Sequence, residues 1–260
     1  MTRLVIRTII SRACTVMLFL YLPFVLQAQE VGEVEVEDLT SREWNMGIFL
    51  NTSGGGISYQ QGWTPDYYKK HFYEIDFLFN RSAKMVRGRN LNYPEATTYS
   101  YGKMCDLFFL RGGYGYQKVL AHKPYWGGVQ IKYTMSAGFS LGIAMPVFLY
   151  IAIPDNSGYY TPELQQYDPE NPLHDISNII GRGPYFAGIG KTKLHPGFYG
   201  KFGFQFDFAT NSRSIQAVEV GVTADMVFPF VQQVAKNNPK PVFLCGYIAY
   251  CFGKKKAHYE

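Results

Sequence analysis

Strict alternation of apolar and polar residues is the feature of this chain that most constrains its fold. In KFGFQFDFA (201–209), large apolar residues alternate with polar or small ones: Phe202, Phe204, Phe206 and Phe208 against Lys201, Gly203, Gln205 and Asp207. A period of two is that of a β-strand, whose successive side chains point to opposite faces. The apolar face is the core of a soluble sandwich, but it faces lipid in an outer-membrane barrel, whose polar face lines the lumen.

Segments of the same kind follow one another from residue 44 to residue 252, with little helical periodicity. They predict about ten strands, at 44–50, 57–63, 73–79, 103–111, 113–120, 129–135, 139–145, 202–208, 218–222 and 242–252. Eight strands is the alternative, because short hairpins are easily counted as two strands where one long strand exists. Either number fits an all-β fold.

The lengths of the connections distinguish a barrel from a sandwich. Short turns are expected on one side, at WTPDYYKK, LRGG, SAG and TNSRS, and long connections on the other, at 81–102, 154–195 and 228–240. Outer-membrane barrels segregate their loops in this way and carry aromatic girdles, and aromatic residues make up 17% of this chain. We therefore predict a single antiparallel up-and-down transmembrane β-barrel of eight to ten strands, with long loops on the extracellular side. The four phenylalanines of 202–208 are then lipid-facing.

The N-terminus predicts export. Arg3, Arg7 and Arg12 precede the apolar run CTVMLFLYLPFVL, and the small residue Ala28 follows it. This is the pattern of a secretory signal peptide; an uncleaved anchor helix is the alternative, although the run is short for a membrane span. The predicted organisation is a signal peptide (1–28), an acidic leader (29–43), a barrel (44–253) and a basic tail (254–260). The predicted location is the outer membrane of a Gram-negative bacterium.

Charge and cysteine content exclude several classes of site. Loss of residues 1–28 removes three of the 25 basic residues and none of the 20 acidic ones, which leaves a net charge of +2. A net charge this close to zero does not indicate a nucleic-acid-binding surface. The three remaining cysteines, Cys105, Cys245 and Cys251, form neither a disulfide framework nor a metal-binding motif. We predict no metal and no cofactor.

The polar faces of the strands predict a charged lumen. Its candidate members are Glu74, Asp76, Lys132, Lys201, Asp207, Glu219 and Asp225, together with Lys103 and Arg111. The lumen of a small barrel is narrow enough for side chains to fill it, and buried charges need partners. A plug of paired charges is the main prediction; a gated ion path and a catalytic carboxylate are the alternatives.

Catalytic motifs are sparse. GxSxG and HExxH are both absent, and His195 in KLHPGFYG, at the rim of the Phe202–Phe208 strand, is the one histidine considered as a candidate. Its main interpretation is a turn or capping residue before Pro196. Catalysis of lipid modification would need a serine and a carboxylate beside it.

Two long connections carry the remaining candidates. Residues 81–102 hold Arg81, Lys84, Arg87 and Arg89, which could contact lipid phosphates or be solvated loop charges. Residues 154–195 are expected to be ordered, with a short helix from Asp175 to Gly181, and to fold over the mouth or dock on another protein.

Four segments resemble a known family: YGKMCDLFFLRGGYGYQK (101–118), YTMSAGFSLGIAMPVFL (133–149), IIGRGPYFAGIGKTKLHPGFYGKFGFQFDF (179–208) and YIAYCFGKKK (247–256). They are similar to small outer-membrane β-barrel proteins typical of Bacteroidota, most of which have no assigned activity. The resemblance implies fold and location, and it supplies no catalytic residue.

Three functions follow as hypotheses. The first is a non-enzymatic barrel that is a scaffold or accessory subunit of an outer-membrane assembly or secretion complex. It would contact outer-membrane lipid, and other outer-membrane or periplasmic proteins through loop 154–195 or the acidic leader. The alternatives are a small-solute pore or transporter and a lipid-modifying enzyme.

Overall fold

The computed structural model describes residues 40–66, 69–82, 85–123, 128–154, 160–210, 213–235 and 239–257. The predicted signal peptide (1–28) and residues 29–39 of the predicted leader lie outside the described residues, as does Lys84. No helix among the described residues is long and apolar enough to cross a membrane.

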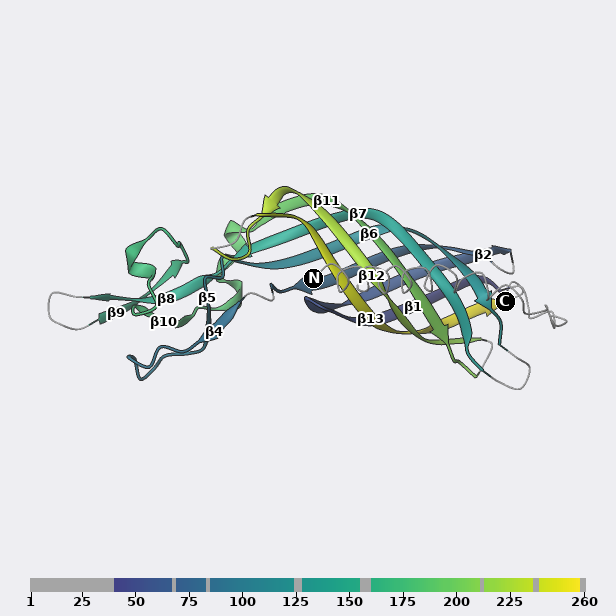
Figure 1. Cartoon of the computed structure of the whole chain (residues 1–260), viewed down its shortest axis with the longest axis horizontal. Helices are drawn as coiled ribbons and strands as arrows, with labels where there is room; N and C mark the ends of the chain where they lie inside the picture. The colour runs from purple at the N-terminus through teal and green to yellow at the C-terminus, as the bar shows by residue number, and fades with distance from the viewer. Residues whose placement is uncertain are drawn as a thin grey trace, which may run out of the picture. The chain divides into compact units, whose positions relative to one another are not determined.

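Eight antiparallel strands close into a barrel in the order β1-β13-β12-β11-β7-β6-β3-β2 (Figure 1). The strands are β1 (Thr40–Asn51), β2 (Gly54–Asp66), β3 (Lys69–Asn80), β6 (Cys105–Ala121), β7 (Gln130–Pro146), β11 (Lys193–Asp207), β12 (Ser214–Val231) and β13 (Lys240–Ala257). The first strand pairs with the last, so the sheet has no free edge. The predicted all-β barrel is confirmed, with the lower of the two expected strand numbers.

Two predicted turns, LRGG and SAG, are wrong. Both sequences lie inside strands, because β6 and β7 are each 17 residues long. Gly113 of β6 pairs with Gly138 of β7, and a Cβ on Gly113 would lie 2.5 Å from the Tyr199 hydroxyl. The glycines therefore make room inside the barrel for a tyrosine side chain.

The predicted boundaries of the barrel are too narrow. β1 begins at Thr40, within the predicted leader, and β13 ends at Ala257, within the predicted tail. Glu43 pairs in register with Lys255, and its carboxylate accepts a hydrogen bond of 2.8 Å from Lys70 Nζ. Acidic and basic residues that resemble solvated tails are here partners on neighbouring strands.

The outer face of the barrel is apolar. Phe202, Phe204, Phe206 and Phe208 are 37–41% exposed, whereas Lys201, Gln205 and Asp207 between them are buried. Trp63, Tyr73 and Tyr114 form part of an aromatic cluster on the outer face of β2, β3 and β6. Charges inside and apolar side chains outside are the reverse of a soluble barrel and the arrangement of a barrel in a bilayer. The chain is an outer-membrane β-barrel.

The connections differ between the two ends of the barrel. At the end where β1 begins and β13 ends they are 67–68, 122–129 and 208–213; at the other end they are 52–53, 81–104, 147–192 and 232–239. By the convention of outer-membrane barrels, the long connections are extracellular, and the start of β1 and the end of β13 are periplasmic. The predicted segregation of loop lengths is thus present.

The two longest connections fold together into a small domain, here called the cap (residues 86–101 and 148–182). It contains the hairpin of β4 (Val86–Gly88) and β5 (Tyr99–Tyr101), the sheet of β8 (Phe148–Pro154), β9 (Tyr160–Gln166) and β10 (Ile179–Arg182), and the turn η1 (Pro172–His174) (Figure 1). A second 3₁₀ turn, η2 (Tyr185–Lys191), follows the cap. The expected helix from Asp175 to Gly181 is absent, because Ile179 and Ile180 are buried as part of β10.

Candidate functional site

A network of buried polar groups occupies the middle of the lumen, and Glu74 is its centre. Glu74 Oε2 accepts hydrogen bonds from Gln60 Nε2 at 2.8 Å and from Lys201 Nζ at 3.0 Å. Its Oε1 accepts bonds from Ser136 Oγ at 3.0 Å and from the Tyr199 hydroxyl at 3.1 Å. These groups come from β2, β3, β7 and β11, so the network joins strands across the barrel.

The same network extends to a second carboxylate. Lys201 Nζ also lies 3.5 Å from Glu219 Oε1, which accepts a hydrogen bond from the Tyr247 hydroxyl. One ammonium group is therefore shared between two buried carboxylates, and two tyrosines supply the neutral donors that the carboxylates still need.

Arg111 forms the next cluster along the lumen. Its guanidinium binds Asp225 through two hydrogen bonds, of which Nε to Oδ1 measures 2.8 Å. Ser140 Oγ donates to the same carboxylate at 3.2 Å, and Asp76 Oδ2 lies 3.8 Å from Arg111 Nη1. Two parallel hydrogen bonds between a guanidinium and a carboxylate form a strong interaction with a specific geometry.

Polar contacts continue toward the periplasmic ends of the strands. Lys132 Nζ lies 3.4 Å from Asp207 Oδ2, and Asn45 Nδ2 donates to Gln60 Oε1 at 3.1 Å. Toward the extracellular ends the interior becomes apolar, with Phe49, Leu78, Leu107, Phe109, Val227, Val231 and Phe243 in one buried cluster. The rings of Phe109 and Phe243 meet edge to face, with 5.5 Å between their centroids. Side chains thus fill the lumen in a polar and an apolar zone.

The predicted lumen residues can now be placed. Glu74, Asp76, Lys132, Lys201, Asp207, Glu219 and Asp225 all lie on inward faces and are buried, as is Arg111. The clusters bring them into three groups, around Lys201, Arg111 and Lys132. Sequence reasoning missed the neutral partners Gln60, Ser136, Tyr199 and Tyr247, although their inward position in each alternating strand could have identified them.

Lys103 is not in the lumen, contrary to the sequence-based assignment. It lies just before β6 and pairs with Asp106, which is on the face of β6 opposite the inward residue Leu107. Arg182 Nη2 reaches the same carboxylate at 2.5 Å. Asp106 therefore joins the barrel to the last strand of the cap, which explains a buried acid among apolar neighbours.

The basic residues of the first long connection are not gathered into one site. Arg81 follows the last residue of β3, whereas Arg87 belongs to β4 and pairs in register with Ser100 in the cap. Arg87 and Arg89 are exposed. Lys84 lies outside the described residues.

His195 is buried, and its Nδ1 lies 2.7 Å from the backbone carbonyl oxygen of Pro229 on the neighbouring strand. Neither a serine hydroxyl nor a carboxylate is bonded to it within the described residues. In the same part of the chain, no group of three or more His, Cys, Asp or Glu side chains is placed to hold a metal ion.

The cap is held together by its own core and by one asparagine. Leu149, Ile151, Tyr167 and Ile179 are buried against one another with Tyr99 and Val147. Asn90 Nδ2 donates to the carbonyl oxygens of Ile176, Ser177 and Ile179 at 2.9–3.1 Å. Burial, with Tyr101 alongside, raises the pKa of Tyr167 to about 12, so its hydroxyl stays neutral.

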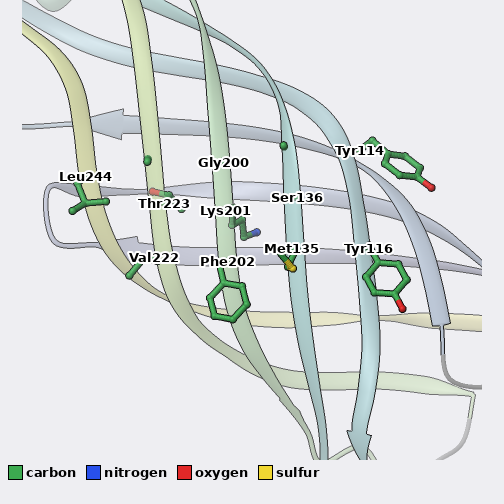
Figure 2. A pocket seen from close by; sticks show the side chains of 12 residues that line it. Tyr114, Tyr116, Met135, Ser136, Gly200, Lys201, Phe202, Val222, Thr223 and Leu244 are labelled. Atoms are coloured by element: carbon green, nitrogen blue, oxygen red, sulfur yellow. The ribbon is translucent and has the colours of Figure 1, made fainter. Parts of the chain in front are cut away.

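A groove of about 480 Å³ crosses the outer wall of the barrel (Figure 2). Its floor is formed where the small residues Ala137, Gly200 and Ala224 pair across β7, β11 and β12. Larger outward residues border it: Tyr114, Tyr116, Met135, Phe202, Val222 and Leu244. The groove is therefore part of the lipid-facing wall of the barrel.

No protein-family model matches the chain. No curated protein matches it either. Among solved structures it is similar to Ail, the attachment invasion locus protein of Yersinia pestis, at 7% identity and a TM-score of 0.38, over 85% of this chain and 99% of that one. It is also similar to Neisserial surface protein A, at 12% identity and a TM-score of 0.34, over 82% of this chain and 95% of that one. Likeness at this level assigns no function.

Proposed function

We propose that the chain is a non-enzymatic outer-membrane barrel that holds its cap at the cell surface as a docking surface. In this role it is a scaffold or accessory subunit of an outer-membrane assembly or secretion complex. The proposal rests on two features that occur together: the lumen is filled, and the extracellular connections form a folded cap. Groups on distant strands bond one another across the lumen, as Lys201 and Glu74 do, whereas a pore needs that space for solute.

The surface of the cap supports a protein partner. Six large hydrophobic side chains of the cap remain exposed: Leu91, Tyr150, Tyr160, Leu164, Leu173 and Ile176. Exposed apolar side chains on a rigid, separately packed element are typical of protein contacts. The resemblance of four segments to small barrels of Bacteroidota belongs to this proposal as well, since it supports a surface protein and supplies no catalytic residue.

The test is recovery of a partner from native membranes. Tagged full-length chain is extracted from outer membranes in mild detergent, and co-purifying proteins are identified by mass spectrometry. We expect a stoichiometric partner that the double variant Leu164→Glu/Ile176→Glu loses. Thr161→Glu/Gln166→Glu is the matched control, because it adds the same two charges at other exposed positions of β9. A protein recovered alone from native membranes would overturn the proposal, as would partner binding that is equal in the double variant and the control.

A further inference from the structure

The segment after the cap packs on the outer wall of the barrel. Met145 of β7 is on the outward side of its strand, yet only 8% of it is exposed. Gly188 of η2 lies over it, since a Cβ there would be 3.1 Å from Met145 Cγ and 2.3 Å from the Pro146 carbonyl oxygen. η2 therefore covers a part of the outer wall, whereas the rest of that wall faces lipid.

An ion cluster fixes the start of this segment. Asp106, on the outward side of β6, binds Arg182 at 2.5 Å and also binds Lys103. The guanidinium of Arg182 stacks on the Tyr185 ring, 3.7 Å from its centroid. Because β6 holds Arg182 and Arg182 supports Tyr185, the first residue of η2 is positioned at the extracellular rim.

The free side of η2 is apolar. Tyr185, Phe186 and Ile189 are 63%, 76% and 58% exposed. Leu194 of β11 and Phe230 of β12 are exposed on the neighbouring wall, where the contact between His195 and Pro229 joins the two strands. The apolar side of η2 therefore continues the lipid-facing surface of the barrel.

One lysine at the end of η2 borders this apolar surface. Lys191 is exposed, its Nζ lies 5.6 Å from the centroid of the Phe148 ring, and none of the ion pairs found among the described residues includes it. Lys193, the first residue of β11, is on the inward side of its strand, since it pairs with the buried Ala144. Large apolar and aromatic side chains with an adjacent cation are the composition of an element that lies in the interface of an anionic membrane.

We propose that η2 is an interfacial anchor for the outer leaflet. Tyr185, Phe186 and Ile189 insert among the acyl chains, and Lys191 binds a phosphate group of the outer-leaflet lipid. The occupant is a phosphorylated lipid, because only a lipid supplies acyl chains and phosphate to one continuous surface. This places the lipid-phosphate contact beside η2, away from the basic residues of the first long connection.

The phosphate contact is tested by lipid retention. Full-length protein is reconstituted with lipid A that carries its phosphates, or with the same lipid A after dephosphorylation, and bound lipid is counted by native mass spectrometry. We expect Lys191→Gln to weaken retention of the phosphorylated lipid about fivefold, since a lysine near an anionic surface contributes about that factor. Lys254→Gln, at the periplasmic end, is the matched control and should retain the lipid. Equal retention by the wild type and the first variant would overturn the phosphate assignment.

Insertion of η2 is tested by measuring how deeply a fluorescent label on it lies in the bilayer. The described cysteines are buried, so Phe186→Cys can be labelled selectively with an environment-sensitive fluorophore in bilayers that contain acyl-chain quenchers. We expect strong quenching there, and little for Leu91→Cys, an apolar position in the cap that is 87% exposed, compared with 76% for Phe186. Quenching of the Phe186→Cys label no greater than that of the Leu91→Cys label would contradict insertion.

Discussion

The ammonium group of Lys201 lies 3.0 Å from a carboxylate oxygen of Glu74, and both side chains are enclosed by the barrel. The two residues are 127 positions apart in the sequence. Their strands, β11 and β3, are separated by β7 and β6 in the sheet. The bond therefore crosses the lumen, and it links the stability of the barrel to the absence of a wide channel.

Removing the cation from this network should destabilise the barrel. Lys201→Met leaves Glu74 and Glu219 buried without their shared partner, and breaking a buried pair costs about 3–5 kcal/mol. Urea unfolding of the protein in vesicles measures the loss, and Lys254→Met, at an exposed position of β13, is the control. A change below about 1 kcal/mol would mean that the carboxylates do not depend on Lys201.

Replacing either of two adjacent glycines of β6 by alanine should have different effects on the stability of the barrel. Gly113→Ala places a Cβ 2.5 Å from the Tyr199 hydroxyl and the Ala137 carbonyl oxygen, whereas Gly112→Ala meets nothing within 4 Å. We expect the first change to cost about 1–3 kcal/mol through overpacking. The second should be neutral or slightly stabilising, because glycine is unfavourable inside a strand. The comparison uses the same unfolding assay, and equal effects would show that Tyr199 does not fill the space over Gly113.

The outward direction of the phenylalanines has a direct test. Phe204→Lys puts a charge on the lipid-facing wall and should cost about 2–4 kcal/mol near the bilayer midplane. Phe204→Leu keeps the site apolar and is the control. The folded fraction after insertion into vesicles can be read from heat-modifiable electrophoretic mobility. Insertion of the lysine variant as complete as that of the leucine variant would contradict a lipid-facing position.

A filled lumen should not conduct. Purified wild-type protein in a planar bilayer is expected to leave the current at baseline, with an open porin as the positive control. The apolar cluster around Phe109 and Phe243 and the bonds of Arg111 to Asp225 both occupy the path. Stepwise conductance events from the purified protein would favour a pore.

The sequence predicts those features of the barrel that follow from the two-residue period of apolar and polar side chains. The alternation in 201–209 identified both a strand and its charged face, and Lys201, Asp207 and Glu219 are on inward faces as that pattern implied. The prediction failed at certain glycines, because glycine is common in turns but also occurs inside strands. Gly112, Gly113 and Gly138 resemble turn residues, but they lie in the middle of long strands.

Long-range contacts account for the other differences. Lys103 was predicted to lie in the lumen, because no local signal indicates that it pairs with Asp106 beside Arg182, 76 positions further along the chain. The cap was expected only as an ordered loop. Its strands β8 and β10 depend on pairing with each other and on the burial of Ile151 and Ile179, which no local pattern specifies.

The measurement that tests the central claim most directly is residue accessibility in intact cells. Thr161→Cys in the cap and Lys254→Cys at the opposite end are both exposed positions, and the described native cysteines are buried. An outer-membrane barrel with an extracellular cap predicts that a membrane-impermeant maleimide labels Thr161→Cys in intact cells and Lys254→Cys only after the outer membrane is permeabilised. Labelling of Lys254→Cys alone in intact cells, or equal labelling of both variants, would contradict it.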